Sequence, residues 1–196
     1  NQTGPMAGGL VVFAAGNDNT NISYPAMYEK VLSVAAIAPD YQKAYYSNYG
    51  NWVSISAPGG DAYYSMGQIY STLTNGQYGF KQGTSMACPN VSGVAALVVS
   101  HAGRPGFTSD DLKQILVDNA SPVMFSYYPQ CVSSMGSGVV DAFASIASLS
   151  TIPPNTVDEI TARVYSNNIE LTWKVPEDED DVKAFIFDVL TSSAQG

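Results

Sequence analysis

Short runs of apolar residues, each followed by turn-forming residues, recur through the first sixty positions of the chain. They occupy residues 10–15 and 31–36, and residues 53–57, where Ser54 and Ser56 stand between apolar residues, repeat the strand-then-turn pattern. Gly, Pro or Asn stands close behind each segment. Continuous apolar runs of this length are typical of parallel strands that are covered on both faces. The pattern therefore predicts buried parallel strands with loops at their carboxyl ends, where the ligand sites of open α/β sheets gather.

A longer apolar stretch, opened by small polar residues, covers residues 83–99. It is apolar around most of its circumference, which predicts a helix that is buried rather than amphipathic. Small residues within it would let neighbouring strands approach closely: Ala87, Gly93, Ala95 and Ala96. Pro89 is expected near the edge of the first turn, about the last place where a helix tolerates proline. Ser85 is then among the first residues of the helix, after Gly83 in a tight turn.

A second helix is indicated by capping signals. Thr108 and the acidic residues that follow it stand directly ahead of residues 112–116, whose pattern is amphipathic. A hydroxyl followed three residues later by a carboxylate, here Asp111, is typical of a helix N-terminus.

The character of the chain changes after Ile152. Two prolines follow it, and nine of the seventeen acidic residues lie beyond it. Residues 160–164 and 169–173 alternate with period two around a short polar turn, which predicts two strands. A third strand is expected at residues 184–190, after an acidic run at 177–181 that is interpreted as a solvated loop. We therefore expect a domain boundary at residue 152.

Composition narrows the class of protein. A chain of 196 residues with 45% hydrophobic residues can bury a core. Its formal net charge of −9 argues against a nucleic-acid partner. No apolar run reaches the 18 or so residues of a membrane span, and no signal-peptide pattern opens the chain. The first residues look like the middle of a protein, so we expect a piece of something longer.

Ser85 and Asn17 each allow two interpretations. A hydroxyl at a helix mouth can attack a carbonyl while an adjacent backbone N–H holds the oxyanion, but a lone serine there is more often a simple cap. Asn17 ends the first apolar run and, taken alone, is most simply a turn residue. Cys88 is interpreted as a small core residue, and a disulfide with Cys131 is left open.

Several motifs, in a fixed order, decide between these interpretations. The Gly-Thr-Ser-Met-Ala-x-Pro-x-Val-Ser-Gly stretch at 83–93 resembles the nucleophile motif of the subtilisin-like serine proteases. Ala-Ala-Gly-Asn at 14–17, Ser-Tyr-Pro-Ala at 23–26, Ala-Pro-Gly at 57–59 and Gly-x-Gly-x-Val-x-Ala at 136–142 are similar to further landmarks of that family. The resemblance covers roughly residues 5 to 150.

The resemblance implies a fold and a domain organisation. Residues 1–152 would be the C-terminal part of a subtilisin-like α/β catalytic domain with a doubly wound parallel sheet. Residues 153–196 look like the opening strands of a fibronectin type III domain, with Trp173 as its core tryptophan. Only about three of the seven or so strands of such a sandwich are present, so this second, all-β segment would be partial.

The resemblance also implies roles for individual residues. Ser85 would be the nucleophile, and the Asn17 amide would share the oxyanion with the Ser85 N–H. Substrate-binding positions carried over from the family are Ala14, Ala15, Gly16, Ser23, Ala26 and Thr84. The pocket residues among them are small and uncharged, which favours a roomy, neutral pocket for large apolar or aromatic side chains. The expected activity is that of a serine endopeptidase acting on polypeptides through an acyl-enzyme.

The other two members of the family's catalytic triad are absent from these 196 residues. The single histidine, His101, lies sixteen residues after Ser85, about 24 Å along a helix, beyond hydrogen-bond reach. We expect the Asp and His to belong to a missing N-terminal part of the catalytic domain, and the present piece to be inert alone. No cofactor is expected for the chemistry. Structural calcium in the full-length protein is left open. One calcium site of the family uses an Asp just before the Ala-Pro-Gly turn, and this chain has Ser54 at the matching position, which removes that anionic ligand. An extracellular or cell-envelope location is a family inference.

Two other interpretations compete. A lipase-type α/β-hydrolase would need a second glycine in its nucleophile elbow, where this chain has Ala87, and a histidine in a later loop. A catalytically dead relative, kept for binding or assembly, is harder to dismiss, although intact Ser85 and Asn17 argue against it.

Overall fold

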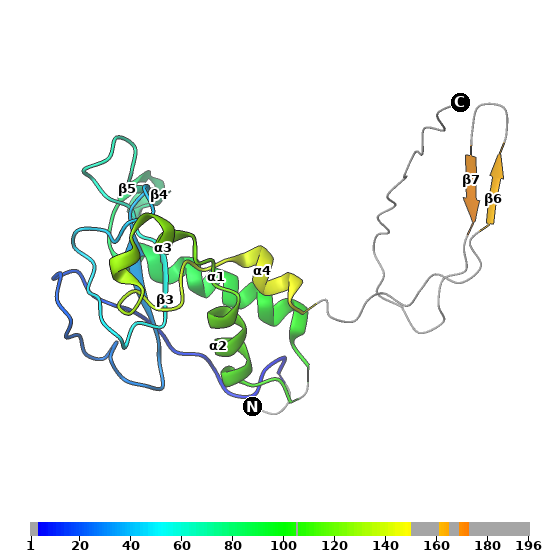
Figure 1. The fold of residues 1–196 in the computed structure, drawn as a ribbon, viewed down its shortest axis with the longest axis horizontal. Coiled ribbons are helices and arrows are strands. Elements are labelled where there is room, and N and C mark those ends of the chain that lie inside the picture. Colours follow the sequence, from blue (N-terminus) through cyan, green and yellow to red (C-terminus); the bar gives the residue numbers. More distant parts are fainter. Residues whose placement is uncertain (1–3, 105, 150–160, 165–168, 173–196) are drawn as a thin grey trace. The chain divides into compact units, whose positions relative to one another are not determined.

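The computed structural model describes residues 4–104, 106–149, 161–164 and 169–172, the last two segments by their backbone alone. The chain divides into two compact units, residues 1–151 and 152–196 (Figure 1). Each unit is described by itself, and the candidate site lies entirely within the first.

A three-stranded parallel sheet forms the centre of the first unit. Its strands are β1 (Val12–Ala14), β2 (Leu32–Ile37) and β3 (Ile55–Pro58), in the order β1-β2-β3. All three predicted strands are confirmed, as is their parallel pairing. The expectation that the first strand is covered on both faces is wrong within the described residues. Because β1 lies at the edge of this sheet, Val11 just before it is 51% exposed and Phe13 is also exposed.

The side chains of β2 alternate between two cores, because successive residues of a strand point to opposite faces. Leu32, Val34 and Ala36 pack into one core with the buried residues of α1 and α2. Ala35 and Ile37 pack into a second core on the other face. A sheet covered on both faces agrees with the α/β class.

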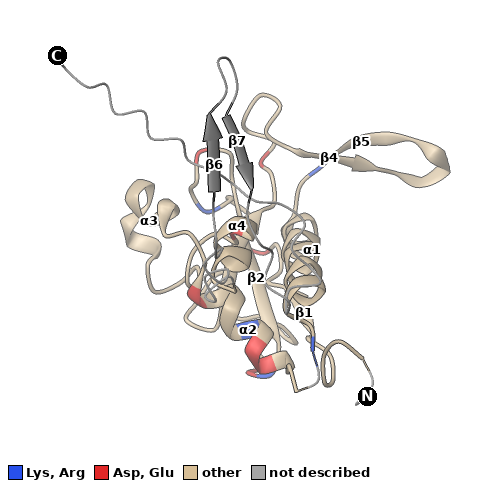
Figure 2. Cartoon of the chain, turned by 90° about the vertical axis from the view of Figure 1, so that its right-hand side faces the viewer, with Lys and Arg blue, Asp and Glu red and all other residues tan. Residues whose placement is uncertain are grey.

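Helix α1 (Thr84–Ala102) packs against all three strands, and Figure 2 shows it beside β1 and β2. Its buried residues recur every three or four positions: Thr84, Ala87, Val91, Ala95, Val98 and Ala102. The opposite face is open, since Leu97 is 50% exposed, so the prediction of a fully buried helix is wrong for the described part of the chain. Pro89 is the sixth residue of α1, early in the second turn and just past the expected edge of the first. Its missing N–H leaves the Ser85 carbonyl without the usual helical donor.

Smaller elements complete the first unit. Helix α2 (Ser109–Asp118) begins with the predicted capping box between Thr108 and Asp111. The two hydrogen bonds from Thr108 lower the pKa of the Asp111 carboxyl, which also lies at the positive end of the helix. The ribbon is coloured red for acidic residues at this first turn in Figure 2. The remaining helical elements are η1 (Thr74–Gly76), α3 (Val123–Tyr127), η2 (Pro129–Cys131) and α4 (Ala142–Ala147).

An antiparallel hairpin of β4 (Ile69–Thr72) and β5 (Tyr78–Lys81), which the apolar pattern did not indicate, leads into α1. It lies at the end of the unit away from α2 (Figures 1 and 2).

The two cysteines lie in different cores and form no disulfide. Cys88 packs beside the first core and Cys131 is buried in the second, on opposite faces of the sheet. Burial raises the pKa of both thiols. The interpretation of Cys88 as a small core residue agrees with this placement.

In the second unit, β6 (Thr161–Val164) and β7 (Ile169–Thr172) pair antiparallel, with Thr161 opposite Thr172. These are two of the strands that the sequence predicted. The third predicted strand, the acidic run and Trp173 lie outside the described residues. Within the described part of the chain, no helix has the length and apolar character needed to cross a membrane.

Candidate active site

The loop that follows β1 meets the first turn of α1 through Asn17 and Thr84. The Asn17 Oδ1 atom accepts hydrogen bonds from the Thr84 N–H at 2.9 Å and from its hydroxyl at 3.0 Å. The Thr84 hydroxyl in turn accepts from the Gly16 N–H at 3.1 Å. These bonds commit the oxygen of the Asn17 amide to the helix, so the Nδ2 end is the one left to donate outward.

Ser85 occupies the second position of α1 and is exposed. The first four N–H groups of an α-helix have no partner within it. Here the Thr84 N–H donates to Asn17, and those of Met86 and Ala87 donate to the Gly83 carbonyl at 2.9 and 3.3 Å. Among the hydrogen bonds of the described residues, the Ser85 N–H is the one of the four without an acceptor. An exposed hydroxyl and an unused N–H thus belong to the same residue.

Glycine is required at position 83 because of the backbone conformation there. Its φ of +145° lies in a region that side-chain-bearing residues rarely adopt. A Cβ added there would stand 3.7 Å from both polar atoms of the Asn17 amide and from Met86 Sδ, which is ordinary contact. Backbone conformation, more than space, therefore selects glycine at the turn that presents Ser85.

The structure brings some of the expected substrate-binding positions to this site and buries others. Ala14, Gly16 and Ser23 are half-buried, and a Cβ on Gly16 would lie 3.2 Å from Ser23 Oγ, so these two segments are neighbours. Ala15 and Ala26 are 0% and 2% exposed, because their side chains face the interior. If Ala15 and Ala26 contribute to a substrate pocket, they therefore do so through their backbone, and their place in the pocket stays a prediction.

The substrate-binding role expected of Thr84 also stays a prediction. This residue is fully buried, and its hydroxyl and N–H are used on Gly16 and Asn17. Its side chain therefore supports Asn17 instead of meeting a substrate. His101 lies in the last turn of α1, as expected, about 24 Å along the helix from Ser85 at 1.5 Å per residue.

Tyr46 lies in the Tyr-Tyr-Ser-Asn-Tyr-Gly segment at 45–50, which precedes β3 and in which the sequence assigned no role to individual residues. Its hydroxyl donates to the Gly60 carbonyl at 2.6 Å and accepts from the Gly83 N–H at 3.0 Å. It therefore braces the turn before α1 against the loop that follows β3. Burial, the largest cause, raises the pKa of the Tyr46 hydroxyl to about 12.

Replacing Tyr46 by phenylalanine should destabilise the protein by about 1–3 kcal/mol at neutral pH, because the Gly60 carbonyl loses its buried donor. The Tyr46 pKa is higher in the folded chain than its ordinary value of 10.0. The neutral phenol therefore stabilises the fold below pH 10, and this contribution is lost as pH rises through about 12.

Urea unfolding of wild type and Tyr46→Phe at pH 8 and pH 11.5, with an active-site inhibitor present to prevent self-digestion, measures both effects. The difference in stability between the two proteins should shrink at the higher pH. A difference that stays constant would show that the hydroxyl is not titrating from this buried position.

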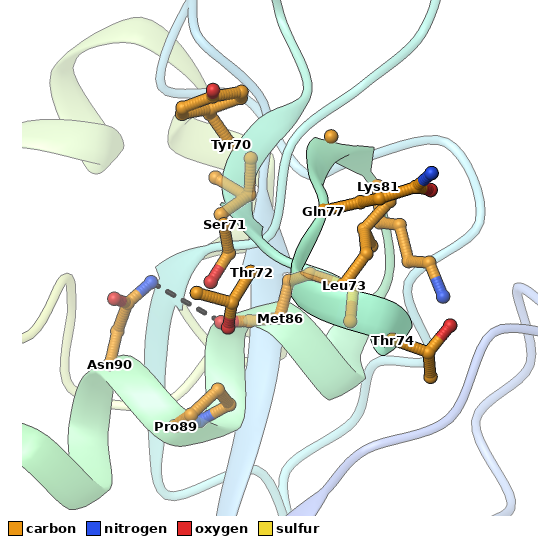
Figure 3. Close-up of a pocket in the computed structure, with 12 residues that line it drawn as sticks. Tyr70, Ser71, Thr72, Leu73, Thr74, Gln77, Lys81, Met86, Pro89 and Asn90 are labelled. Carbon is orange, nitrogen blue, oxygen red and sulfur yellow. Dashed lines mark hydrogen bonds between the residues drawn. The ribbon is translucent and has the colours of Figure 1, made fainter.

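A cavity of about 770 Å³ opens beside the first turns of α1 (Figure 3). Met86, Pro89 and Asn90 of α1 face Thr72 and Leu73 from the hairpin side. The Asn90 amide donates to the Met86 carbonyl at 3.3 Å, which ties the helix side of the wall together. Because Met86 follows Ser85 directly, this cavity borders the candidate nucleophile.

Metal ligands are sparse in the part of the chain that the structure describes, which contains no group of three or more His, Cys, Asp and Glu side chains able to hold a metal ion. Ser54, the residue expected to weaken a calcium site, has its hydroxyl 3.2 Å from that of Ser33. It also accepts from the Ser33 N–H at 3.2 Å.

Comparison with known proteins agrees with this arrangement. The Subtilase family matches residues 2–165. The chain is 42% identical over 150 residues to the extracellular basic protease of Dichelobacter nodosus, covering 71% of the chain and 23% of that protein. It is 39% identical over 137 residues to the thermostable alkaline protease of Halalkalibacterium halodurans, covering 69% of the chain and 34% of the relative. The chain thus spans about a quarter to a third of the length of these curated relatives.

Solved structures give the same result. A protease of Pseudoalteromonas arctica PAMC 21717 matches with a TM-score of 0.62 and 37% identity, covering 71% of this chain and 42% of that one. The epidermin leader peptide processing serine protease of Staphylococcus aureus matches with a TM-score of 0.60 and 25% identity, over 71% and 40% of the two chains. These matches argue against the lipase-type alternative. With the motifs in order and the two landmark segments in contact, the chain belongs to the subtilase family.

Proposed function

We propose that this chain is part of a subtilisin-like serine endopeptidase, and that Ser85 is its nucleophile. One observation carries the proposal: Ser85, with its exposed hydroxyl and unused N–H, directly follows Thr84, whose N–H and hydroxyl both donate to Asn17 Oδ1. We infer that the Ser85 N–H and the Asn17 Nδ2 act as donors to the same oxygen. The two donors can stabilise negative charge on a carbonyl oxygen, while the hydroxyl attacks its carbon.

The reaction would proceed in two balanced halves. Ser85 Oγ bonds to the carbonyl carbon of the scissile peptide, and its proton passes to a general base. That base returns the proton to the leaving amine as the peptide C–N bond breaks, which leaves an acyl-enzyme. Water then attacks the ester, again through the base, and releases the carboxylic acid and the free serine.

The general base must be a residue outside this sequence. His101, the single histidine of the 196 residues, lies in the last turn of α1, far beyond hydrogen-bond reach of Ser85. We therefore expect the upstream part of the catalytic domain to supply the Asp and His of the triad, and the 196 residues alone to be inactive.

The family supports several finer proposals. Polypeptides are the expected substrates, and no cofactor is needed for acyl transfer by this route. Relatives named as extracellular proteases favour secretion of the full-length protein. Structural calcium elsewhere in that protein and a fibronectin type III-like segment from residue 153 onward are retained as proposals, the latter supported by the β6–β7 hairpin.

A fluorophosphonate probe tests the proposed function directly, because it reacts with an activated serine and leaves ordinary hydroxyls alone. In the full-length protein it should label Ser85, identified by peptide mapping, and leave Ser92 and Ser100 of the same helix unmodified. Heat-denatured protein is the control and should not react. The isolated 196 residues should label barely at all. A native full-length protein that fails to label would favour the catalytically dead relative.

The residues of the expected specificity pocket support a preference for large apolar or aromatic side chains before the scissile bond. Gly16 and Ser23 are small, uncharged and adjacent, and Ala15 and Ala26 add no side chain to the opening. A panel of peptides that vary only at this position, cleaved by the full-length enzyme, should show higher kcat/KM for Phe, Tyr or Leu than for Lys, Arg or Glu. A strong preference for Lys or Arg would contradict a neutral pocket.

A further inference from the structure

We propose that Asn48 is a positioning residue, which holds the loop between β1 and the site in the one conformation that aims the Asn17 amide at the developing oxyanion. The inference rests on the proposed function of Asn17. Asn48 lies in the segment between β2 and β3, thirty-one residues further along the chain, and the sequence motifs assigned it no role.

Asn48 brackets Asn17 with hydrogen bonds to the backbone on both sides of it. Its Oδ1 accepts from the N–H groups of Asp18 at 2.8 Å and Thr20 at 3.1 Å. Its Nδ2 donates to the Ala15 carbonyl at 3.0 Å, and its own N–H donates to the Gly16 carbonyl at 2.9 Å. One residue thus fixes the chain immediately before and immediately after Asn17.

Burial makes these bonds hard to replace. Asn48 is 1% exposed, so water cannot take over from a lost partner. An amide is the side chain that fits, because the site needs an acceptor for two N–H groups and a donor for one carbonyl. Aspartate would satisfy the two N–H groups but present a carboxylate oxygen to the Ala15 carbonyl.

Gly16 shows how closely the loop passes over Asn48. A Cβ on Gly16 would stand 2.3 Å from Asn48 Nδ2, a distance that no real contact allows, and the φ of Gly16 is +101°. Glycine is therefore required at this position for close approach as well as for conformation.

The support beneath Asn48 is rigid. The neighbouring Ser47 hydroxyl accepts from the Ala36 N–H of β2 at 2.9 Å and donates to the Asn48 carbonyl at 3.0 Å. At the far end of the loop, Lys43 Nζ donates to Asn19 Oδ1 at 2.8 Å. The central strand therefore holds the backbone of the loop through Asn48, while α1 holds the Asn17 side chain through Thr84. A displacement of about 1 Å at such a site can cost a hundredfold in rate.

The test compares Asn48→Ala and Asn48→Asp in the full-length enzyme. We expect Asn48→Ala to lower kcat by about 10- to 100-fold with a small change in KM, since the donor acts mainly in the transition state. Asn48→Asp keeps the acceptor for Asp18 and Thr20 and loses only the donor to the Ala15 carbonyl, so it should lower kcat per folded molecule less than Asn48→Ala. Ser56→Ala is the matched control. Ser56 lies in β3, away from the site, and the substitution removes a buried hydroxyl that donates to the Met135 carbonyl at 2.7 Å.

A double-mutant cycle with Asn17→Ala separates positioning from stability. In the Asn17→Ala background there is no side-chain amide for Asn48 to position. Adding Asn48→Ala or Asn48→Asp to that variant should therefore lower kcat by less than about threefold. Full additivity, or a kcat per folded molecule that is unchanged in both single variants, would overturn the inference while leaving the proposed function intact. A wild-type protein that neither labels nor hydrolyses peptides would remove both.

Discussion

Replacing Ser85 by alanine should abolish peptide-bond hydrolysis by the full-length protein. In subtilisin, the source of this figure, loss of the nucleophilic serine lowers kcat by about a millionfold. The residual rate over water would come from the oxyanion donors, because the Ser85 backbone N–H and the Asn17 amide survive the change. KM should change little. The measurement is steady-state hydrolysis of a peptide anilide, together with loss of fluorophosphonate labelling.

The proposed catalytic role of Ser85 can be tested without disturbing the fold, because Ser85 is exposed and its hydroxyl makes no hydrogen bond among the described residues. Alanine is a good helix former, so α1 should keep its stability. Ser92→Ala is the matched control, since Ser92 is an exposed serine of the same helix whose hydroxyl bonds only to the Cys88 carbonyl, at 3.2 Å. An enzyme that keeps its activity without the Ser85 hydroxyl would refute the assignment of the nucleophile and, with it, the acyl-enzyme mechanism.

Replacing Asn17 should lower kcat by about a hundred- to a thousandfold, a magnitude that comes from the equivalent loss of an oxyanion-hole donor in subtilisin. Asn17→Asp is the sharper of two variants. A carboxylate can still accept from the Thr84 N–H and hydroxyl, which preserves the contact between the loop and α1. It has no N–H to offer the oxyanion and places negative charge where more would develop, so its kcat should fall at least as far as that of Asn17→Ala.

Single-turnover and steady-state kinetics on several peptides measure this effect, with Asn21→Ala as the control. Asn21 is exposed, and its backbone carbonyl, not its side chain, accepts a hydrogen bond from Trp52 Nε1 at 2.9 Å. An equal loss in the control would point to general loosening of the loop. A rise in KM with kcat unchanged would mean that Asn17 binds the ground state and does not act on the transition state.

Local signals in the sequence were sufficient for most of the elements near the site. Three short, largely apolar segments predicted strands, because a strand that is buried in a parallel sheet is mostly apolar along its length. Thr108 and Asp111 marked the start of α2 because the capping box is a contact between residues three apart. The motif from 83 to 93 marked the mouth of α1, where Gly83 adopts a conformation that other residues avoid.

Local signals could not predict which faces of the strands and helices are exposed. Nothing in the apolar run of β1 indicates that it lies at the edge of this sheet, and the composition of α1 conceals that one face is open, because exposure depends on which segments pack nearby. The hairpin of β4 and β5 was missed because its aromatic and polar residues do not form a simple apolar run.

By itself, the sequence determined the family, the order of the main elements and the two residues, Ser85 and Asn17, on which the proposed chemistry depends. Only the tertiary structure decided how those residues are held. Asn48 and Tyr46 are thirty-one and thirty-seven positions away from Asn17 and Gly83, the residues whose segments they brace. Both act through hydrogen bonds to segments that are distant in the sequence and meet at the carboxyl edge of the sheet. The role of such a buried polar side chain can therefore be inferred only from the folded structure, which shows its partners.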